Sequence, residues 1–361
     1  MNYDVETQVL LALLRAALWK TPPDMALFPL SPEAWQRVFR LAEEQTVTAL
    51  VYDGLDCLPE AMLPPEDLVL RWLAATDRIV RHNRTMNTVL RRLCNAFWAE
   101  GLRPVLLKGQ ASAQCYRHPL LRQAGDIDLY FPHSGDAQRA EAWVRRQGVH
   151  VEREPDGSIY YIWCGVKVEH HPRLLDLYNP RLQSLVQGAE VHEGFVVRPI
   201  GDDAFPVEIP APALEMLMLS SHILKHAMGH GIGLRQLCDV ACLCRRLSPA
   251  SYGEPFRGLC RQTGLERWQR LLHGCLRDEF HLTKTELPYA DAAASSQALM
   301  RIVLRGGNFG QYASARSQAA VAPWHRKCRT AAAFVRHLGF SLRYAPSEAF
   351  WMVAQLLRGQ V

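Results

Sequence analysis

The sequence lacks the long apolar runs, the internal repeats and the large charge excess that mark specialised classes of protein. None of its apolar runs approaches the ~20 residues that a membrane-spanning helix needs, and no repeat or low-complexity tract is present. The net charge of +5 is well below that of a protein that coats nucleic acid. These absences argue against an integral membrane segment and a solenoid, and they favour an ordinary globular protein.

The sequence also lacks the basic N-terminal region of a secretion signal, because Asp4 and Glu6 stand near its start. We therefore expect a cytoplasmic protein whose ten cysteines are reduced thiols. Zinc motifs are missing as well. His222 and His226 have the spacing of two zinc ligands on one helix face, but no glutamate stands at the zincin position between them, and the nearby cysteines do not have zinc-ribbon spacing.

Hydrophobic periodicity divides the chain into three regions and predicts an α+β protein. Residues 1–101 are predicted to be helical, with one helix from Ser31 to about Leu50 and a long helix from Asp67 to Glu100. Residues 102–200 alternate between strand and helix patterns and form the predicted α/β core. Residues 201–361 are predicted to form a C-terminal helical domain.

The most informative stretch is Gly125-Asp126-Ile127-Asp128-Leu129, which has the composition of a strand. Side chains alternate along a strand, so Asp126 and Asp128 should project from the same face. Two carboxylates held that close are costly unless a cation lies between them, and hard oxygen ligands favour Mg²⁺. The motif therefore predicts a metal site, against the simpler interpretation of an exposed polar strand.

A second motif precedes this strand. Residues 104–107 form a short apolar strand pattern, Lys108 and Gly109 follow at once, and residues 110–116 have the pattern of a helix start. A glycine turn between a strand and a helix lets the backbone approach phosphate oxygens closely, and a lysine adds positive charge. Lys108, Gly109, Ser112 and Gly125 are therefore the candidate phosphate-binding residues.

Together these segments resemble a known signature. Leu106-Leu107-Lys108-Gly109, the Tyr116, Pro119 and Arg122 segment, and the Asp-Ile-Asp-Leu strand are similar to the nucleotidyltransferases of the DNA polymerase β superfamily. More narrowly, they resemble a largely uncharacterised bacterial nucleotidyltransferase family. The resemblance implies a mixed sheet with helices on one face, flanked by N-terminal and C-terminal helical regions. It also implies a third catalytic carboxylate on a later strand.

The leading candidate for that third carboxylate is Glu169. Residues 158–163 and 166–170 have the pattern of a hairpin around a Cys164-Gly165 turn. The following segment resembles the acidic-x-His-x-Arg-Leu segment of the family, which makes Glu169 the third metal ligand and His171 a nearby substrate-binding residue. Glu152 and Glu154, on the preceding strand, are the competing candidates.

Further candidates lie outside the core. The resemblance places His222, His226, Arg235 and Asp239 toward the cleft, with Arg122, as substrate-binding residues. Arg235 and Asp239 are one helical turn apart, so a simple surface ion pair is the alternative interpretation. Trp324, His325, Arg326, Lys327 and Arg329 form a basic aromatic cluster. Such a cluster suits RNA or an anionic lipid surface, and also suits a solvated helix start.

The implied function is transfer of a nucleoside monophosphate from a nucleoside triphosphate, with ATP as the expected donor and Mg²⁺ or Mn²⁺ bound to Asp126, Asp128 and Glu169. The acceptor hydroxyl belongs to an unidentified small molecule, protein or RNA. Two alternatives use the same metal and phosphate chemistry. One is a catalytically silent nucleotide-binding regulatory protein, and the other is a kinase on the same fold.

Overall fold

The computed structural model describes residues 3–229, 231–291, 295–307 and 336–357. The helices are α1 Val5–Trp19, α2 Pro32–Glu44, α3 Thr48–Gly54, α4 Glu66–Ala99, α5 Gln110–Ala113, α6 Asp136–Arg146, α7 Gln183–Glu193, α8 Pro212–Met228, α9 Leu234–Arg246, α10 Pro249–Thr263, α11 Glu266–Phe280, α12 Gln297–Gly306 and α14 Pro346–Leu357. The strands are β1 Val105–Leu106, β2 Asp126–Tyr130, β3 Glu152–Arg153, β4 Ile159–Trp163, β5 Val166–His171, β6 Phe195–Ile200 and β7 Phe205–Pro210.

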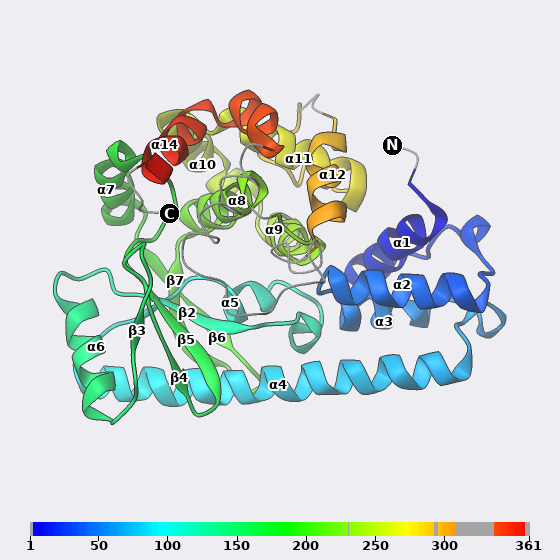
Figure 1. Ribbon diagram of the computed structural model, residues 1–361, viewed down its shortest axis with the longest axis horizontal. Helices are drawn as coiled ribbons and strands as arrows, with labels where there is room; N and C mark the ends of the chain where they lie inside the picture. The colour runs from blue at the N-terminus through cyan, green and yellow to red at the C-terminus, as the bar shows by residue number, and fades with distance from the viewer. Residues whose placement is uncertain (1–2, 230, 292–294, 308–335, 358–361) are drawn as a thin grey trace.

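The seven strands form one mixed sheet in the order β3-β4-β5-β2-β1-β7-β6. Strand β2 runs parallel to β5 and antiparallel to β1, and β1 runs parallel to β7 on its other side. The prediction of an α+β protein with flanking helical regions is confirmed (Figure 1). Strand β7 lies beyond residue 200, so the sheet continues past the point where we expected the α/β core to end.

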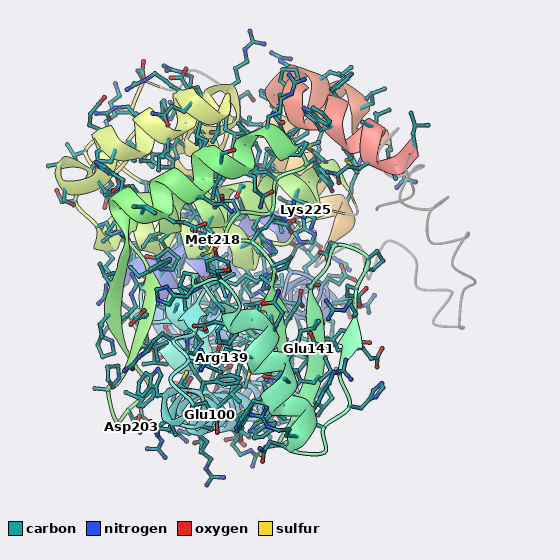
Figure 2. The ribbon with its side chains drawn as sticks, turned by 90° about the vertical axis from the view of Figure 1, so that its left-hand side faces the viewer. Glu100, Arg139, Glu141, Asp203, Met218 and Lys225 are labelled. Atoms are coloured by element: carbon teal, nitrogen blue, oxygen red, sulfur yellow. The ribbon has the colours of Figure 1, made fainter. Side chains whose placement is uncertain are left out.

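Helices cover both faces of the sheet, which corrects the expectation that they lie on one face only. On one face, α4 and α6 bury the side chains of Ile127 and Leu129. On the other face, Val105 and Tyr130 belong to the core that includes α8 and α9. Figure 2 shows Met218 and Lys225 of α8 on the upper side and Glu100, Arg139 and Glu141 on the lower side. The sheet is therefore the middle layer of the molecule.

Helix α4 joins the N-terminal helices to the sheet. Its 34 residues make it about 50 Å long at 1.5 Å per residue. Leu68 and Trp72, near its start, pack with α1 to α3, whereas residues from Met86 to Phe97 pack under the sheet. The N-terminal and C-terminal helices also touch each other. Trp19 Nε1 donates a hydrogen bond to the carbonyl of Phe280 at 2.8 Å, so these regions share one core.

Local sequence signals explain several boundaries. The hydroxyl of Ser31 caps α2 by accepting from the backbone N–H of Ala34 at 3.2 Å. The predicted continuous helix to Leu50 is wrong, because α2 ends at Glu44, Thr46 adopts a positive φ of 54°, and α3 begins after it. The predicted hairpin is confirmed: Cys164 and Gly165, with φ of 50° and 79°, connect β4 to β5.

Two predictions concern features outside the sheet. The basic aromatic cluster from Trp324 to Arg329 lies outside the described residues. Within the described ranges, the chain forms no helix with the length and apolar content to span a membrane. The nine cysteines of those ranges are free thiols.

Candidate active site

The two aspartates of the motif lie on strand β2, as predicted. Asp126, Asp128 and Tyr130 alternate with Ile127 and Leu129, whose side chains are buried against α4 and α6. The carboxylates therefore face α8 and α9. The apolar residues of the motif thus fix the orientation of the strand, and the aspartates occupy the opposite face.

Glu169 lies on the neighbouring strand, directly opposite Asp128. Strands β2 and β5 are parallel, and their register pairs Asp128 with Glu169 and Tyr130 with His171. Paired residues on adjacent strands project from the same face, so Glu169 and His171 join Asp128 there. The competing Glu152 lies on the edge strand β3, separated from the strand of Asp128 by β4 and β5, and it accepts a hydrogen bond from Tyr160. The register thus favours Glu169 over Glu152.

A compact group of ligand atoms surrounds Asp128. Its Oδ1 is 2.7 Å from Nε2 of His171 and 3.3 Å from Nζ of Lys108. The same His171 Nε2 lies 3.6 Å from Oε1 of Glu169. Ligand atoms of Asp128, Glu169 and His171 all lie within 4.8 Å of one another, which is compatible with one metal ion. Asp126 is next to this group on the same strand face but is not part of it.

The charges of these residues are strongly interdependent. The negative charge of Asp128, followed by burial, raises the pKa of Asp126. Burial alone would raise the pKa of Asp128, but Lys108 and His171 outweigh burial and hold it well below its ordinary value. Burial would likewise lower the pKa of Lys108, but Asp128 and Asp126 outweigh it and raise that pKa. Lys108 and Asp128 therefore form a charged pair at neutral pH.

The predicted glycine turn between a strand and a helix is present, because Gly109 lies between β1 and α5. Gly109 has a φ of 66°, and a Cβ at this position would lie 3.4 Å from the carbonyl oxygen of Asp126. The predicted helix after it is shorter than expected, because α5 is the single turn from Gln110 to Ala113. Ser112 is buried, and its Oγ has no hydrogen-bond partner among the described residues. Backbone groups of the turn and Lys108, rather than a long helix dipole, are therefore the candidates for phosphate contact.

Asp239 pairs with Arg122 and not with Arg235, so the alternative interpretation of a surface ion pair within α9 is wrong. Arg122 Nε and Nη2 donate to the two oxygens of Asp239 at 3.0 and 2.6 Å, and both side chains are buried. The hydroxyl of Tyr116 donates to the same carboxylate at 2.7 Å. Asp239 thus ties the segment before β2 to α9 and positions Arg122. Arg235 instead donates to the carbonyl of Gln123 at 2.8 Å.

A cavity connects the sheet residues with the helices above them. Lys108, Gly109, Gly125, Asp126 and Asp128 line it from below. His222 of α8, with Arg122, Arg235 and Asp239, lines its other walls. Its volume is about 70 Å³, smaller than the ~300 Å³ of a typical small-molecule site. A nucleotide that bound here would therefore extend from this cavity toward the surface.

The two histidines of α8 are neighbours, but the described residues around them do not form a metal group. The ring centroids of His222 and His226 are 4.5 Å apart. Burial, with the charge of Lys108, holds the pKa of His222 well below its ordinary value, so this ring is neutral. Within the described ranges, Asp128, Glu169 and His171 are the group with ligand atoms close enough to hold a metal. His222 therefore contributes a neutral, polar wall to the cavity.

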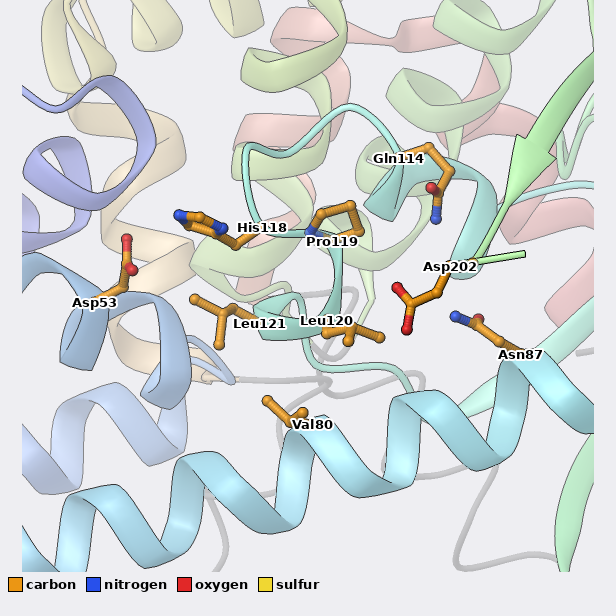
Figure 3. A pocket seen from close by; sticks show the side chains of 10 residues that line it. Asp53, Val80, Asn87, Gln114, His118, Pro119, Leu120, Leu121 and Asp202 are labelled. Carbon is orange, nitrogen blue, oxygen red and sulfur yellow. The ribbon is translucent and has the colours of Figure 1, made fainter. Parts of the chain in front are cut away.

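A larger cavity of about 430 Å³ lies elsewhere in the molecule. Figure 3 shows it between α4, which contributes Val80 and Asn87, and the segment that carries Gln114 and His118. Asp202 closes one end of it, and none of the sequence-predicted site residues lines it. The larger cavity is thus separate from the carboxylate group.

Sequence reasoning missed two features of the site. It treated His171 as a substrate contact, whereas the structure places its Nε2 beside both Asp128 and Glu169. The alternation of strand β5 carries this signal, since residues 169 and 171 share a face. It also missed the partner of Asp239, because Arg122 is separated from it by 117 residues and no short-range pattern connects them.

Comparison with known proteins identifies a family for this chain. Neither the curated proteins nor the solved structures include one that matches this chain. Residues 31–280 match the family described as an uncharacterised nucleotidyltransferase. The match includes α2 to α4, the whole sheet and α8 to α11, and therefore every residue of the site described above. Because it covers more than half of the 361 residues, this chain belongs to that nucleotidyltransferase family.

Proposed function

We propose that this protein is a metal-dependent nucleotidyltransferase of the DNA polymerase β type. It transfers a nucleoside monophosphate, with ATP as the donor, to a hydroxyl group of a small molecule, protein or RNA. The observation that carries the proposal is the register of β2 and β5, which sets Glu169 opposite Asp128 on the face that also holds Asp126. Lys108 lies at the same carboxylate, where phosphate groups would arrive.

The residues present fit a divalent cation. Asp128 Oδ2 is buried and has no hydrogen-bond partner among the described residues, so one lone-pair-bearing oxygen of this group is available. Carboxylate oxygens of Asp126, Asp128 and Glu169 are the hard ligands that Mg²⁺ and Mn²⁺ prefer, and His171 adds a nitrogen. When bound, such a cation neutralises the charge of the α-phosphate and activates the acceptor hydroxyl.

The chain itself contributes positioning and charge. The acceptor hydroxyl gives up its proton to solvent and its oxygen forms a bond to the α-phosphorus, while the bond from that phosphorus to the bridging oxygen breaks, so that pyrophosphate leaves. Lys108 neutralises part of the triphosphate, and the backbone at Gly109 allows close approach because the position has no side chain. Arg122 is held by Asp239, whose carboxylate also accepts a hydrogen bond from Tyr116, and it lies with Asp126 on the wall of the same cavity.

The test is label transfer from ATP. Purified protein and a cell extract are incubated with Mg²⁺ and either α-labelled or γ-labelled ATP, with the Asp126→Asn variant as control. We expect the α label to be transferred and the control to lose transfer. Transfer of the γ label would replace this proposal with a kinase. Binding of ATP with Mg²⁺ but without transfer of either label would replace it with a nucleotide-binding regulatory protein.

Glu169→Gln is expected to weaken Mn²⁺ binding by about tenfold or more and to abolish transfer, because the substitution removes one anionic ligand and changes little else. Glu152→Gln is the matched control, since its carboxylate lies on the same sheet but belongs to edge strand β3. Binding of Mn²⁺ can be measured by electron paramagnetic resonance. Equal Mn²⁺ affinities in the two variants would remove Glu169 from the metal site.

A further inference from the structure

Three carboxylates, Asp126, Asp128 and Asp239, line the cavity above the aspartate strand, and its cationic side chains differ in how they contact them. Three cationic side chains line it: Lys108, Arg122 and Arg235. Lys108 Nζ lies 3.3 Å from Asp128 Oδ1, and Arg122 forms a bidentate ion pair with Asp239. Arg235 forms no ion pair with any carboxylate in the part of the chain that the structure describes. Arg235 is therefore the cation of this lining that contacts no carboxylate directly, while Asp239 and Asp126 act on its charge from a distance.

Arg235 is held in place by neutral partners. It is the second residue of α9, it is 9% exposed, and its Nη1 donates to the carbonyl of Gln123 at 2.8 Å. With the Gln236 amide turned to satisfy both of its ends, the Gln236 oxygen accepts from Arg235 Nη2 at 3.1 Å. The Nε–H group is buried and has no partner among the described residues. The guanidinium is thus fixed, with donor capacity unused, at the wall of the cavity.

Keeping a cation in this position is costly. Burial, followed by the charge of Arg122, lowers the pKa of Arg235 to about 10. The side chain is still charged at neutral pH, and Asp239 and Asp126 favour that charge without occupying its free N–H donor. A guanidinium group binds phosphate oxygens with two directed, charge-assisted hydrogen bonds. A phosphate is therefore the chemical partner that suits this residue.

We infer that Arg235 binds the terminal phosphates of the nucleoside triphosphate, on the wall of the cavity contributed by α9, while Lys108 binds them from the sheet. The identity of this anion rests on the proposed function. A phosphate group on the acceptor has the same chemistry, and the experiment below separates the two sources. The inference gives the C-terminal helices a direct part in recognising the donor.

The test measures affinities by calorimetry, with Mg²⁺ present and inorganic pyrophosphate, ATP and AMP as probes. Arg235→Gln is expected to weaken binding of pyrophosphate and ATP about 10- to 100-fold, the value of a hydrogen bond to a charged group, and to leave AMP unchanged. Arg235→Lys keeps the positive charge but loses the paired N–H donors of the guanidinium, so an intermediate loss of affinity is expected. Arg246→Gln is the matched control, because this exposed residue ends the same helix.

The outcomes separate the inference from the proposed function. Unchanged pyrophosphate affinity in Arg235→Gln, an equal loss for AMP, or wild-type protein that does not bind pyrophosphate would each overturn the inference. Unchanged ATP affinity with impaired transfer to a phosphorylated acceptor alone would assign Arg235 to the acceptor and overturn it too. Failure of the wild type to transfer the α label overturns only the proposed function. Thermal unfolding of each variant verifies that it is folded.

Discussion

Replacing Asp128 with asparagine is expected to lower nucleotidyl transfer by at least about 10²–10³-fold, the loss seen when one preorganised electrostatic group is removed from an active site. Asparagine keeps the shape of the side chain but removes its charge. Asp128 is the residue that Lys108, His171 and Glu169 all approach, so no neighbour can take its place. The effect should therefore be at least as large as that of any other single carboxylate substitution in the site.

The fold should tolerate this substitution. The charge of Asp128 is the main cause of the raised pKa of Asp126, so neutralising it relieves a repulsion between the two carboxylates. It also removes the counter-charge of Lys108, whose side chain is still partly exposed and can reach water. These effects oppose each other, and we expect a change in the free energy of unfolding within the usual ~1–2 kcal/mol of a point substitution.

Thermal unfolding with and without Mg²⁺ separates loss of metal from loss of fold. A metal at 100 times its dissociation constant stabilises the wild type by about 2.7 kcal/mol, and Asp128→Asn should lose this gain. Asp156→Asn, in the exposed turn before β4, is the control that should keep both the gain and the activity. Full transfer activity in Asp128→Asn would contradict the metal assignment.

The second large effect is expected on stability. Asp239→Asn should lower the free energy of unfolding by about 3–5 kcal/mol, the cost of breaking a buried ion pair by removing one partner. The substitution leaves the Arg122 guanidinium buried without its counter-charge, and the charge of Arg235 lies close enough to repel it. Tyr116 also loses the charged acceptor of its hydroxyl.

Denaturant unfolding measures this loss, and two further variants define its cause. Asp77→Asn breaks an exposed pair with Arg81, so we expect less than about 1 kcal/mol. The double variant Arg122→Met and Asp239→Leu removes both charges, so it should recover much of the stability that Asp239→Asn loses, but not the activity. A loss below 1 kcal/mol in Asp239→Asn would show that Asp239 is not the anchor of this segment.

Those parts of the site that depend on local periodicity were predictable from the sequence. The alternation of apolar and acidic residues in residues 126–130 predicted both the strand and the shared face of the aspartates. The hairpin at Cys164 and Gly165 set the direction of β5, and its alternation placed Glu169 on one face. Sequence could not show that β5 runs beside β2, because strand pairing depends on distant parts of the chain.

The remaining parts depend on contacts between distant segments. Strand β7 was not predicted, because Phe205–Pro210 contains two prolines and its place beside β1 is set by tertiary packing. Helix α7 was missed too; with Val186 as its sole buried residue, Gln183–Glu193 has almost no inward face to produce a pattern. Within α9, Asp239 is one helical turn from Arg235, and the sequence therefore suggests that the two residues pair. In the structure, Arg122 from a distant segment donates two hydrogen bonds to the Asp239 carboxylate instead.

The position of β1 between β2 and β7 affects how the protein can be made. Val105 pairs with Tyr130 on one side and with Glu208 on the other. Arg122 and its ion-pair partner Asp239 are 117 residues apart in the sequence. A chain emerging from the ribosome cannot complete the sheet until β7 has been synthesised, and it cannot balance the charge of Arg122 until α9 has been synthesised. Contacts of such long range slow folding and expose unpaired strand edges in the meantime. Nascent chains that stop before α9 should therefore depend on chaperones to stay in solution.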